Sequence, residues 1–454
     1  MIFLPAALLL ALSLALGACW TVSRQSAPSA GAQDAAAAPR GPGPAVRDVS
    51  VYARDREEEM PVIVRDRLDS EGKPVESREY ITIQFDALTN DPLDFRIKFF
   101  HCDRNWRPDE NVFVNDVNHN TSFTLEYVPS PDAVHGYTYR FVNRFPDKDD
   151  AVRFDFSGNW IFRLMNRAQS VVYAEGRFFV ADRLLPVEAS VRNDFITGNS
   201  SPMNQSHHVA VRFPLADETL GGYYTTVDVY RNRRFYQAYR IDINDRDPLT
   251  FVDGIGRGYR RFDISNILPG NEYRSLDLSN QTRYPNYQLV KPVGGADQVR
   301  LYWRTGEDRD GIAIRNTFQG NASEYLDVLF RLDLFQSDRD RLAAARRNVY
   351  VVGAFNDWEP REVDALQYDP EERAMTVRES LRRGIYDYQY VTASWDARAG
   401  LARDQDWFEL EGNDWRTTNT YSAFVYYNDP RFGGFDRIAA YVRVASNGSG
   451  DPPR

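Results

Sequence analysis

Short runs of alternating apolar and polar residues recur along the chain and constrain its fold more than any other feature. Arg78–Phe85 and Phe95–Phe100 both show the period of two that buries one face of an antiparallel strand. Turn-forming sequences such as Asn90-Asp-Pro92 and Ser157-Gly-Asn159 separate the runs at the spacing typical of β-sandwiches. Only Asp338–Arg347 has helical character. The pattern therefore predicts an all-β chain of tandem immunoglobulin-like or β-sandwich modules.

The grouping of these runs predicts three modules. A second series of strand-like runs begins after Leu185-Pro186, and a third opens near Ala322 with Tyr325–Leu334. We expect the last module to be early-set-like. The expected division is 48–183 for an N-terminal β-sandwich domain, 184–321 for a middle β domain, 322–445 for a C-terminal early-set immunoglobulin-like β-sandwich, and 446–454 for a disordered tail.

The stretch Asn348–Pro360 carries the sharpest binding hypothesis. Its β-branched and aromatic run predicts a strand that breaks at Gly353 into a turn rich in Asn and Asp. A tryptophan at the corner of that turn, Trp358, resembles the corner of glycogen- and starch-binding modules, where an indole stacks on a sugar ring. Further tryptophans follow at Trp395, Trp407 and Trp415. A corner tryptophan can equally pack beneath its turn, so both roles stay open for Trp358.

Charge argues against nucleic acid as a partner. The 454 residues contain 55 basic and 65 acidic side chains, which gives a net charge of −10. Phosphate binding needs a basic face. A local basic patch at Arg231, Arg233 and Arg234 is interpreted as a solvated strand edge.

The N-terminus predicts export with a lipid anchor. An apolar run, Ile2–Leu16, is followed by Leu16-Gly-Ala-Cys19, which is the pattern of a bacterial lipoprotein signal. We therefore expect residues 1–19 to be a lipoprotein-type signal peptide, with lipid attached at Cys19. A plain secretory signal and a membrane span remain alternatives, since no Lys or Arg precedes the apolar core. Residues 20–47, rich in Ala, Pro and Gly, are expected to form a flexible tether.

The sequence contains no clear catalytic or metal-binding pattern. Neighbours along a strand point to opposite faces, so His101 and Cys102 are not expected to form a nucleophile pair, nor His207 and His208 a metal site. The glycines of Asp253–Gly258 lack the helix of a phosphate-binding loop and predict a turn. The remaining candidate, an acidic cluster, is expected to be a solvated loop; it consists of Asp404, Asp406, Glu409, Glu411 and Asp414. We predict no catalytic, cofactor-binding or metal-binding residue and no cofactor.

The order of the motifs resembles one known family. In sequence the motifs are His101–Pro108, Tyr137–Tyr139, Asn143–Pro146, Ser157–Asn159, Asn266–Arg274, Val349–Trp358, Gly384–Tyr388, Glu411–Asn413, Thr418–Tyr421, Val425–Tyr427 and Asp436–Ile438. Over about residues 48–442 this series resembles the plug protein of the type IX secretion system of Bacteroidota.

The resemblance implies a non-enzymatic role. Such a plug binds the periplasmic mouth of the large outer-membrane β-barrel translocon and seals it when no cargo is engaged. It further implies an exported protein on the periplasmic side of the outer membrane. The lipid anchor is predicted from the N-terminal sequence alone, since the lipoprotein signal and the tether are not part of the family pattern. The resemblance assigns no contact residue; Trp106, Gly158, Gly270, Gly353 and Trp358 are interpreted as residues that hold turns. The competing hypothesis is a glycan-binding surface or periplasmic lipoprotein that uses aromatic residues around Trp358.

Overall fold

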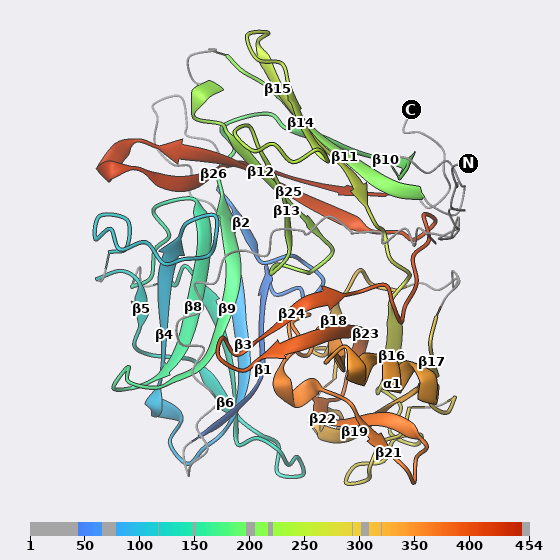
Figure 1. Cartoon of the computed structure of the whole chain (residues 1–454). Helices are drawn as coiled ribbons and strands as arrows, with labels where there is room; N and C mark the ends of the chain where they lie inside the picture. The colour runs from blue at the N-terminus through green and yellow to red at the C-terminus, as the bar shows by residue number, and fades with distance from the viewer. Residues whose placement is uncertain are drawn as a thin grey trace, which may run out of the picture.

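The computed structural model consists almost entirely of β-strands, which confirms the prediction of tandem β-sandwich modules (Figure 1). It describes residues 44–65, 79–116, 118–148, 151–196, 205–216, 221–292, 294–300, 308–318 and 320–446. Six sheets pair into three sandwiches, here called the first, middle and third modules.

The first module packs a sheet of order β1-β3-β7-β6 against a sheet of order β2-β9-β8-β4-β5. Alternate residues of these strands meet in an aromatic-rich core, in which Phe85 stacks on Phe141 with ring centroids 4.4 Å apart. Its strands are β1 (Ala45–Ala53), β2 (Val62–Val64), β3 (Ile81–Leu88), β4 (Phe95–Cys102), β5 (Thr121–Ser122), β6 (Tyr127–Pro129), β7 (Tyr139–Phe145), β8 (Gly158–Asn166) and β9 (Val172–Ala181).

The middle module contains the end of the chain. Its sheets have the orders β10-β11-β15-β14 and β13-β12-β25-β26, so β25 pairs with β12, a strand that lies almost 200 residues earlier. Its strands are β10 (Glu188–Phe195), β11 (Gln205–Pro214), β12 (Thr226–Arg231), β13 (Ala238–Asp242), β14 (Thr250–Asp253), β15 (Tyr259–Ile267), β25 (Thr420–Asp429) and β26 (Phe435–Ala445).

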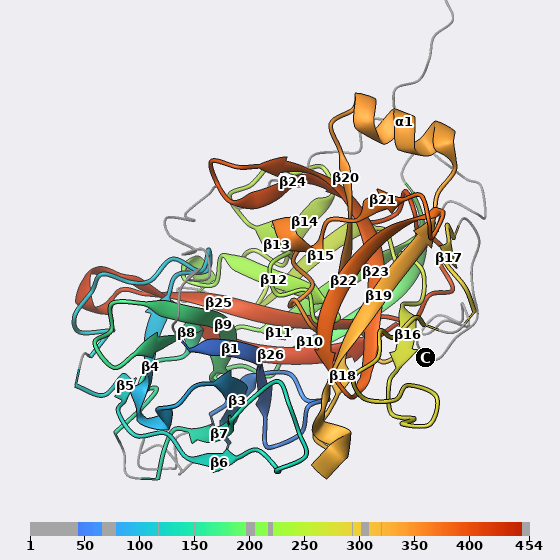
Figure 2. The same cartoon turned by 90° about the horizontal axis from the view of Figure 1, so that it is seen from below.

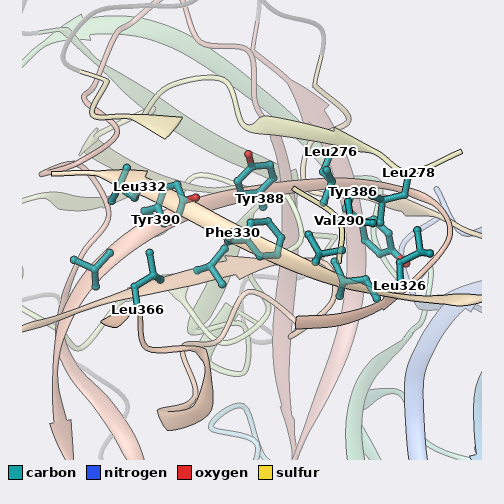
Figure 3. Close-up of a cluster of buried hydrophobic side chains, with 14 of the residues drawn as sticks. Leu276, Leu278, Val290, Leu326, Phe330, Leu332, Leu366, Tyr386, Tyr388 and Tyr390 are labelled. Carbon is teal, nitrogen blue, oxygen red and sulfur yellow. The ribbon is translucent and has the colours of Figure 1, made fainter. Parts of the chain in front are cut away.

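The third module is inserted into the middle one. Strands β16, β18, β20 and β24 all pair with the long strand β23, and β17-β19-β22-β21 form the opposite sheet. Leucines and tyrosines from both sheets fill the core (Figure 3). The strands are β16 (Arg274–Asp277), β17 (Asp297–Gln298), β18 (Ala313–Ile314), β19 (Tyr325–Asp333), β20 (Asn348–Gly353), β21 (Gln367–Asp369), β22 (Ala374–Arg382), β23 (Ile385–Asp396) and β24 (Leu401–Asp406).

Three local features differ from the expected division. Strand pairing crosses the expected boundary between 184–321 and 322–445, because β16–β18 belong to the third module and β25–β26 to the middle one. The expected tether 20–47 overlaps β1, since Ala45 already pairs with Leu88. The one α-helix of the described residues, α1, spans Gln336–Ala344, two residues earlier than expected. The expected segments 1–19 and 446–454 lie outside the described residues, except for Ser446.

The modules form a triangle in which each contacts the other two. The first module occupies the lower left of Figure 1, the third the lower right, and the middle module spans the top, with β25 and β26 reaching over the first module. Figure 2 shows α1 projecting from the third module at the side away from the first. In the described part of the chain, no helix is both long enough and apolar enough to cross a membrane.

Candidate functional site

The seam between the first and middle modules combines apolar packing with ion pairs. Phe179 of β9 stacks on Phe424 of β25 with ring centroids 4.1 Å apart, at the centre of a buried cluster. Around it, Arg104 of the first module donates to Asp436 (3.1 Å) and Asp242 (3.3 Å). Arg240 in turn donates to the Arg104 carbonyl oxygen at 2.7 Å. Apolar area and opposite charges thus hold this seam together.

The seam between the first and third modules is a buried ionic network. Arg315, which is only 5% exposed, pairs with Glu57 (3.1 Å) and also with Asp48. Arg382 reaches the same Asp48 at 3.5 Å. Tyr325 donates its hydroxyl to Asp86, 3.0 Å away. Because each charge has a partner of opposite sign, the network fixes the two modules at a defined position.

The seam between the middle and third modules is rich in carboxylates. Thr420 of β25 donates to Asp310 (2.5 Å), and the Thr418 backbone N–H donates to Glu272 (2.9 Å). The backbone N–H of Tyr273 donates to Asp308 at 2.5 Å. Burial raises the pKa of Glu272 to about 8 and that of Asp310 to about 6. This seam therefore contains two carboxyls whose pKa values are raised towards neutral pH.

A crevice lies where the three seams meet. Its empty space of about 680 Å³ includes open solvent, so the part enclosed by the walls is smaller. Each module contributes to its wall. The first provides β1 and β9, the middle one provides the turn after β12, and the third provides β18 and the turn after β20. The crevice is the candidate functional site.

Two arginines on the crevice wall lack a carboxylate partner among the described residues. The guanidinium of Arg177 lies 3.7 Å from the Tyr236 ring centroid and 4.8 Å from that of Trp106. Arg233 donates to the carbonyl oxygens of Glu57 (3.0 Å) and Glu59 (2.5 Å). Burial, together with neighbouring arginines, lowers the pKa of Arg233 to about 10. Both cations are held in place by rings and carbonyl groups rather than by anions.

The opposite charge comes from the turn after β20. Asp357 lines the crevice and is exposed to it, and Glu359 lies two residues further on. Desolvation by the surrounding walls raises the pKa of both carboxyls, although nearby arginines oppose the shift. Within the described ranges, neither carboxylate accepts a side-chain hydrogen bond or forms an ion pair. The crevice thus carries charges of both signs that do not neutralise each other by contact.

The prediction that the basic patch at Arg231, Arg233 and Arg234 is a solvated strand edge is wrong. Arg231 and Arg234 are 3% and 5% exposed, and they project from the end of β12 and the following turn into the junction of the modules. Arg234 donates to Gln389 (2.8 Å) and lies 3.7 Å from the Trp407 ring centroid. Flanking aromatics, Tyr230 and Phe235-Tyr236, were the signal that could have indicated burial, because arginine packs on aromatic faces.

Trp358 packs beneath its turn, which is one of the two roles that the sequence left open. The side chain is 4% exposed, its ring centroid lies 4.3 Å from that of Tyr273, and its indole N–H donates to the Gly311 carbonyl at 3.0 Å. Gly311 has φ +88°, and a Cβ there would lie 3.1 Å from the indole. Trp358 also contributes to the crevice wall, and its ring packs against Tyr273 and Arg234.

His101 and Cys102, the first candidate pair, lie in different surroundings. The His101 ring contacts Asp109 through Nδ1 (2.5 Å) and the Ser157 carbonyl through Nε2 (3.0 Å). Cys102 is fully buried, and burial raises the pKa of its thiol well above the usual value. The two side chains of the motif therefore point to different surroundings, as expected of strand neighbours.

His207 and His208 also diverge. His207 is buried against Tyr421, with Nδ1 2.8 Å from the hydroxyl, and burial lowers its pKa to about 4. His208 contacts Asp263 at 2.7 Å on the other face of β11. In the described residues no group of three or more His, Cys, Asp or Glu side chains is arranged to hold a metal ion.

The remaining candidates separate in space or form turns. The glycines of Asp253–Gly258 form the turn of the β14–β15 hairpin. Of the acidic cluster, Glu411 pairs with buried Arg274 (2.9 Å) and Asp414 with Arg416 (2.8 Å), so these carboxylates face different partners. Cys19 lies outside the described residues.

Comparison with known proteins bears on the first module. Residues 46–182 match the family model of the type 9 secretion system plug protein 1st domain. The resemblance predicted from the motifs is confirmed over this segment, here called the plug-family segment. No curated protein matches the chain.

The fold beyond the plug-family segment also recurs. A crystal structure of a hypothetical protein from Parabacteroides merdae ATCC 43184, at 2.30 Å resolution, is similar over 88% of this chain and 97% of that one, with a TM-score of 0.65. At 18% identity this likeness concerns the fold alone. The plug-family segment supports a role connected with type 9 secretion.

Proposed function

We propose that this protein is the non-enzymatic plug of a type IX secretion translocon. It binds the periplasmic mouth of the large outer-membrane β-barrel and closes it when no cargo is engaged. The observation that carries this proposal is the match of residues 46–182 to the plug first domain.

The packing of the modules supports the proposal physically. A wide pore can be closed only by a broad body that does not deform under the passage of solutes. Three sandwiches that contact one another through apolar, ionic and hydrogen-bonded seams form a broader body than the same modules joined end to end. The contact with the barrel must also be reversible, so we propose a polar interface of moderate size.

A lipid anchor at Cys19 completes the proposal. Acylation at Cys19 and the tether that follows would keep the plug near the membrane and raise its concentration at the pore mouth. Mass spectrometry of the N-terminal peptide tests this directly. A peptide that begins at an acylated Cys19 is expected, whereas an unmodified peptide that retains the apolar run would exclude it.

The proposal is tested by purification of the protein from detergent-solubilised outer membranes, with partners identified by mass spectrometry. We expect a very large β-barrel protein in stoichiometric amount. The matched control is Cys19→Ala, which removes the lipid but leaves the folded modules intact. If this variant still captures the barrel, the contact is between proteins rather than a shared detergent micelle. Recovery of the protein alone, or on polysaccharide, would contradict the plug function.

The glycan-binding alternative makes a different prediction at Trp358. Truncation of this buried ring leaves a cavity between the turn and Tyr273, so Trp358→Ala should cost about 3–5 kcal/mol of stability. A glycan array of the wild-type protein provides the second measurement. Glycan binding that disappears in a Trp358→Ala variant of unchanged melting temperature would favour the alternative.

A further inference from the structure

The crevice differs from the rest of the charged surface in how its charges are paired. Half of the charged side chains on its wall are neutralised by ion pairs, as Arg315 is by Glu57 and Glu175 is by Arg163. Arg177 and Asp357 line the same crevice from different modules, and within the described residues neither belongs to an ion pair. Charges that are partly desolvated and unpaired are costly unless something else compensates them.

Contacts hold both charged residues in place on the wall. Arg177 is fixed between the rings of Trp106 and Tyr236, and it donates to the Phe235 carbonyl at 3.3 Å. Asp357 has φ +53° in a turn closed by a hydrogen bond from the Trp358 N–H to the Gly353 carbonyl at 3.0 Å. Arg177 and the backbone at Asp357 are therefore fixed on the crevice wall.

Unused hydrogen-bonding groups lie beside the cationic wall. The Oγ of Ser50 on β1 and the Nε of Arg177 on β9 are buried without a hydrogen-bond partner. Buried polar atoms are normally paired, so two such atoms on the wall of one crevice indicate a place for ligand atoms. Both can donate, and the adjacent guanidinium of Arg233 is a further donor held in place by backbone carbonyls. The cationic wall is thus suited to a carboxylate.

We propose that the crevice binds a small zwitterion: a free amino acid or the end of a peptide. Its carboxylate would lie at Arg177 and Ser50, and its ammonium group at Asp357. This inference does not depend on the plug proposal, because it concerns a cavity enclosed by all three modules rather than a surface for the translocon.

The experiment is isothermal titration calorimetry of the full chain with triglycine. Triglycine that carries an N-acetyl and a C-terminal amide group is the capped control, because it keeps the backbone but removes both charges. We expect heat of binding from triglycine and none from the capped form. Equal binding of the two forms, or no binding of either at millimolar concentration, would overturn the proposal. So would binding of acetate as tightly as triglycine, since that would indicate a simple anion site.

Variants locate the site. Arg177→Met and Asp357→Asn should each weaken triglycine binding at least tenfold. The matched controls are Arg192→Met and Asp194→Asn, which remove an exposed ion pair of β10 and should leave the affinity unchanged. Asp357→Asn changes an exposed side chain and should remain folded, which a melting curve verifies, so it keeps the test valid if Arg177→Met is unstable. Unchanged affinity in a folded Asp357→Asn variant would contradict the proposal.

Two further titrations distinguish the sources of the zwitterion. Glycine that binds as tightly as triglycine would assign the site to free amino acids. Triglycine that binds at least tenfold more tightly than glycine would assign it to peptide ends.

Discussion

The first–middle and middle–third seams both bury surface of the middle module, but they use opposite chemistry. In the first–middle seam, stacked Phe179 and Phe424 are surrounded by arginine–carboxylate pairs such as that of Arg104 and Asp436. In the middle–third seam, Glu272 and Asp310 have raised pKa values. Within the described ranges, neither of these two carboxyls forms an ion pair. Ion pairs and aromatic packing stabilise a seam at any moderate pH. The stability of a seam with unpaired carboxyls depends instead on whether those carboxyls are protonated.

The largest expected effect comes from removal of the aromatic contact. Phe424 is fully buried, so Phe424→Ala loses its apolar area and leaves a cavity against Phe179. We expect the free energy of unfolding to fall by about 3–5 kcal/mol, as measured by urea denaturation. Phe251→Ala is the control, because Phe251 is 63% exposed. A loss below about 1 kcal/mol for Phe424→Ala would show that apolar packing does not hold this seam.

The second prediction concerns pH. Burial is the main cause that raises the pKa of Glu272 to about 8, of Asp387 to about 7 and of Asp310 to about 6. The unfolded chain binds these protons with pKa values near 4, so their stabilising effect is complete below about pH 4 and is lost as pH rises through 6 to 8. We expect the free energy of unfolding to fall by several kcal/mol between pH 5 and pH 8, with the largest part from Glu272.

A variant assigns this pH dependence to the seam. Glu272→Gln keeps the oxygen that accepts from Thr418 but cannot ionise, so the fall between pH 5 and pH 8 should become smaller. Glu371→Gln, at an exposed position, should leave the fall unchanged. Urea denaturation at several pH values measures both. An identical pH profile for Glu272→Gln and the wild type would place the titrating groups elsewhere.

The third prediction concerns the ion pairs of the first–middle seam. Arg104→Met leaves Asp436 and Asp242 without their shared cation. Since Arg104 is 24% exposed, we expect a loss of about 1–2 kcal/mol, less than for a fully buried pair.

An exposed pair completes the comparison. Arg144→Met breaks the contact with Asp55, but Arg144 is 63% exposed, so the loss should stay below about 1 kcal/mol. Urea denaturation measures both losses of stability. Equal losses for Arg104→Met and Arg144→Met would show that partial burial in the seam does not strengthen the ion pairs of Arg104.

Much of the secondary structure could be predicted because strand formation depends on local pattern. The expected strand Tyr325–Leu334 corresponds to β19, and Phe95–Phe100 lies within β4. Residues Ser122–Tyr127 show the same strand-like alternation, but the chain leaves β5 at Ser122 and enters β6 only at Tyr127. There the alternation of side chains was present, but the neighbouring strands offered no continuous partner.

The candidate site could not be predicted in the same way. Arg177, Arg233 and Asp357 are far apart in the sequence, and each stands in an ordinary strand or turn context. Only the packing of three modules makes them neighbours. The same packing covers Trp358, whose burial depends on Tyr273 and Gly311 from outside its own turn.

By itself, the sequence determined the all-β class, most strands, the turns and the order of motifs that resembles the plug family. These follow from side-chain alternation and turn chemistry, which act over a few residues. The tertiary structure alone decided that β25 and β26 complete the middle module, that Arg231 and Arg234 are buried, and that a charged crevice lies between the modules. Such features depend on contacts between segments far apart in the sequence, as Glu57 and Arg315 of the crevice wall are, at a separation of 258 residues. The local alternation of side chains does not determine which edge strand another strand pairs with.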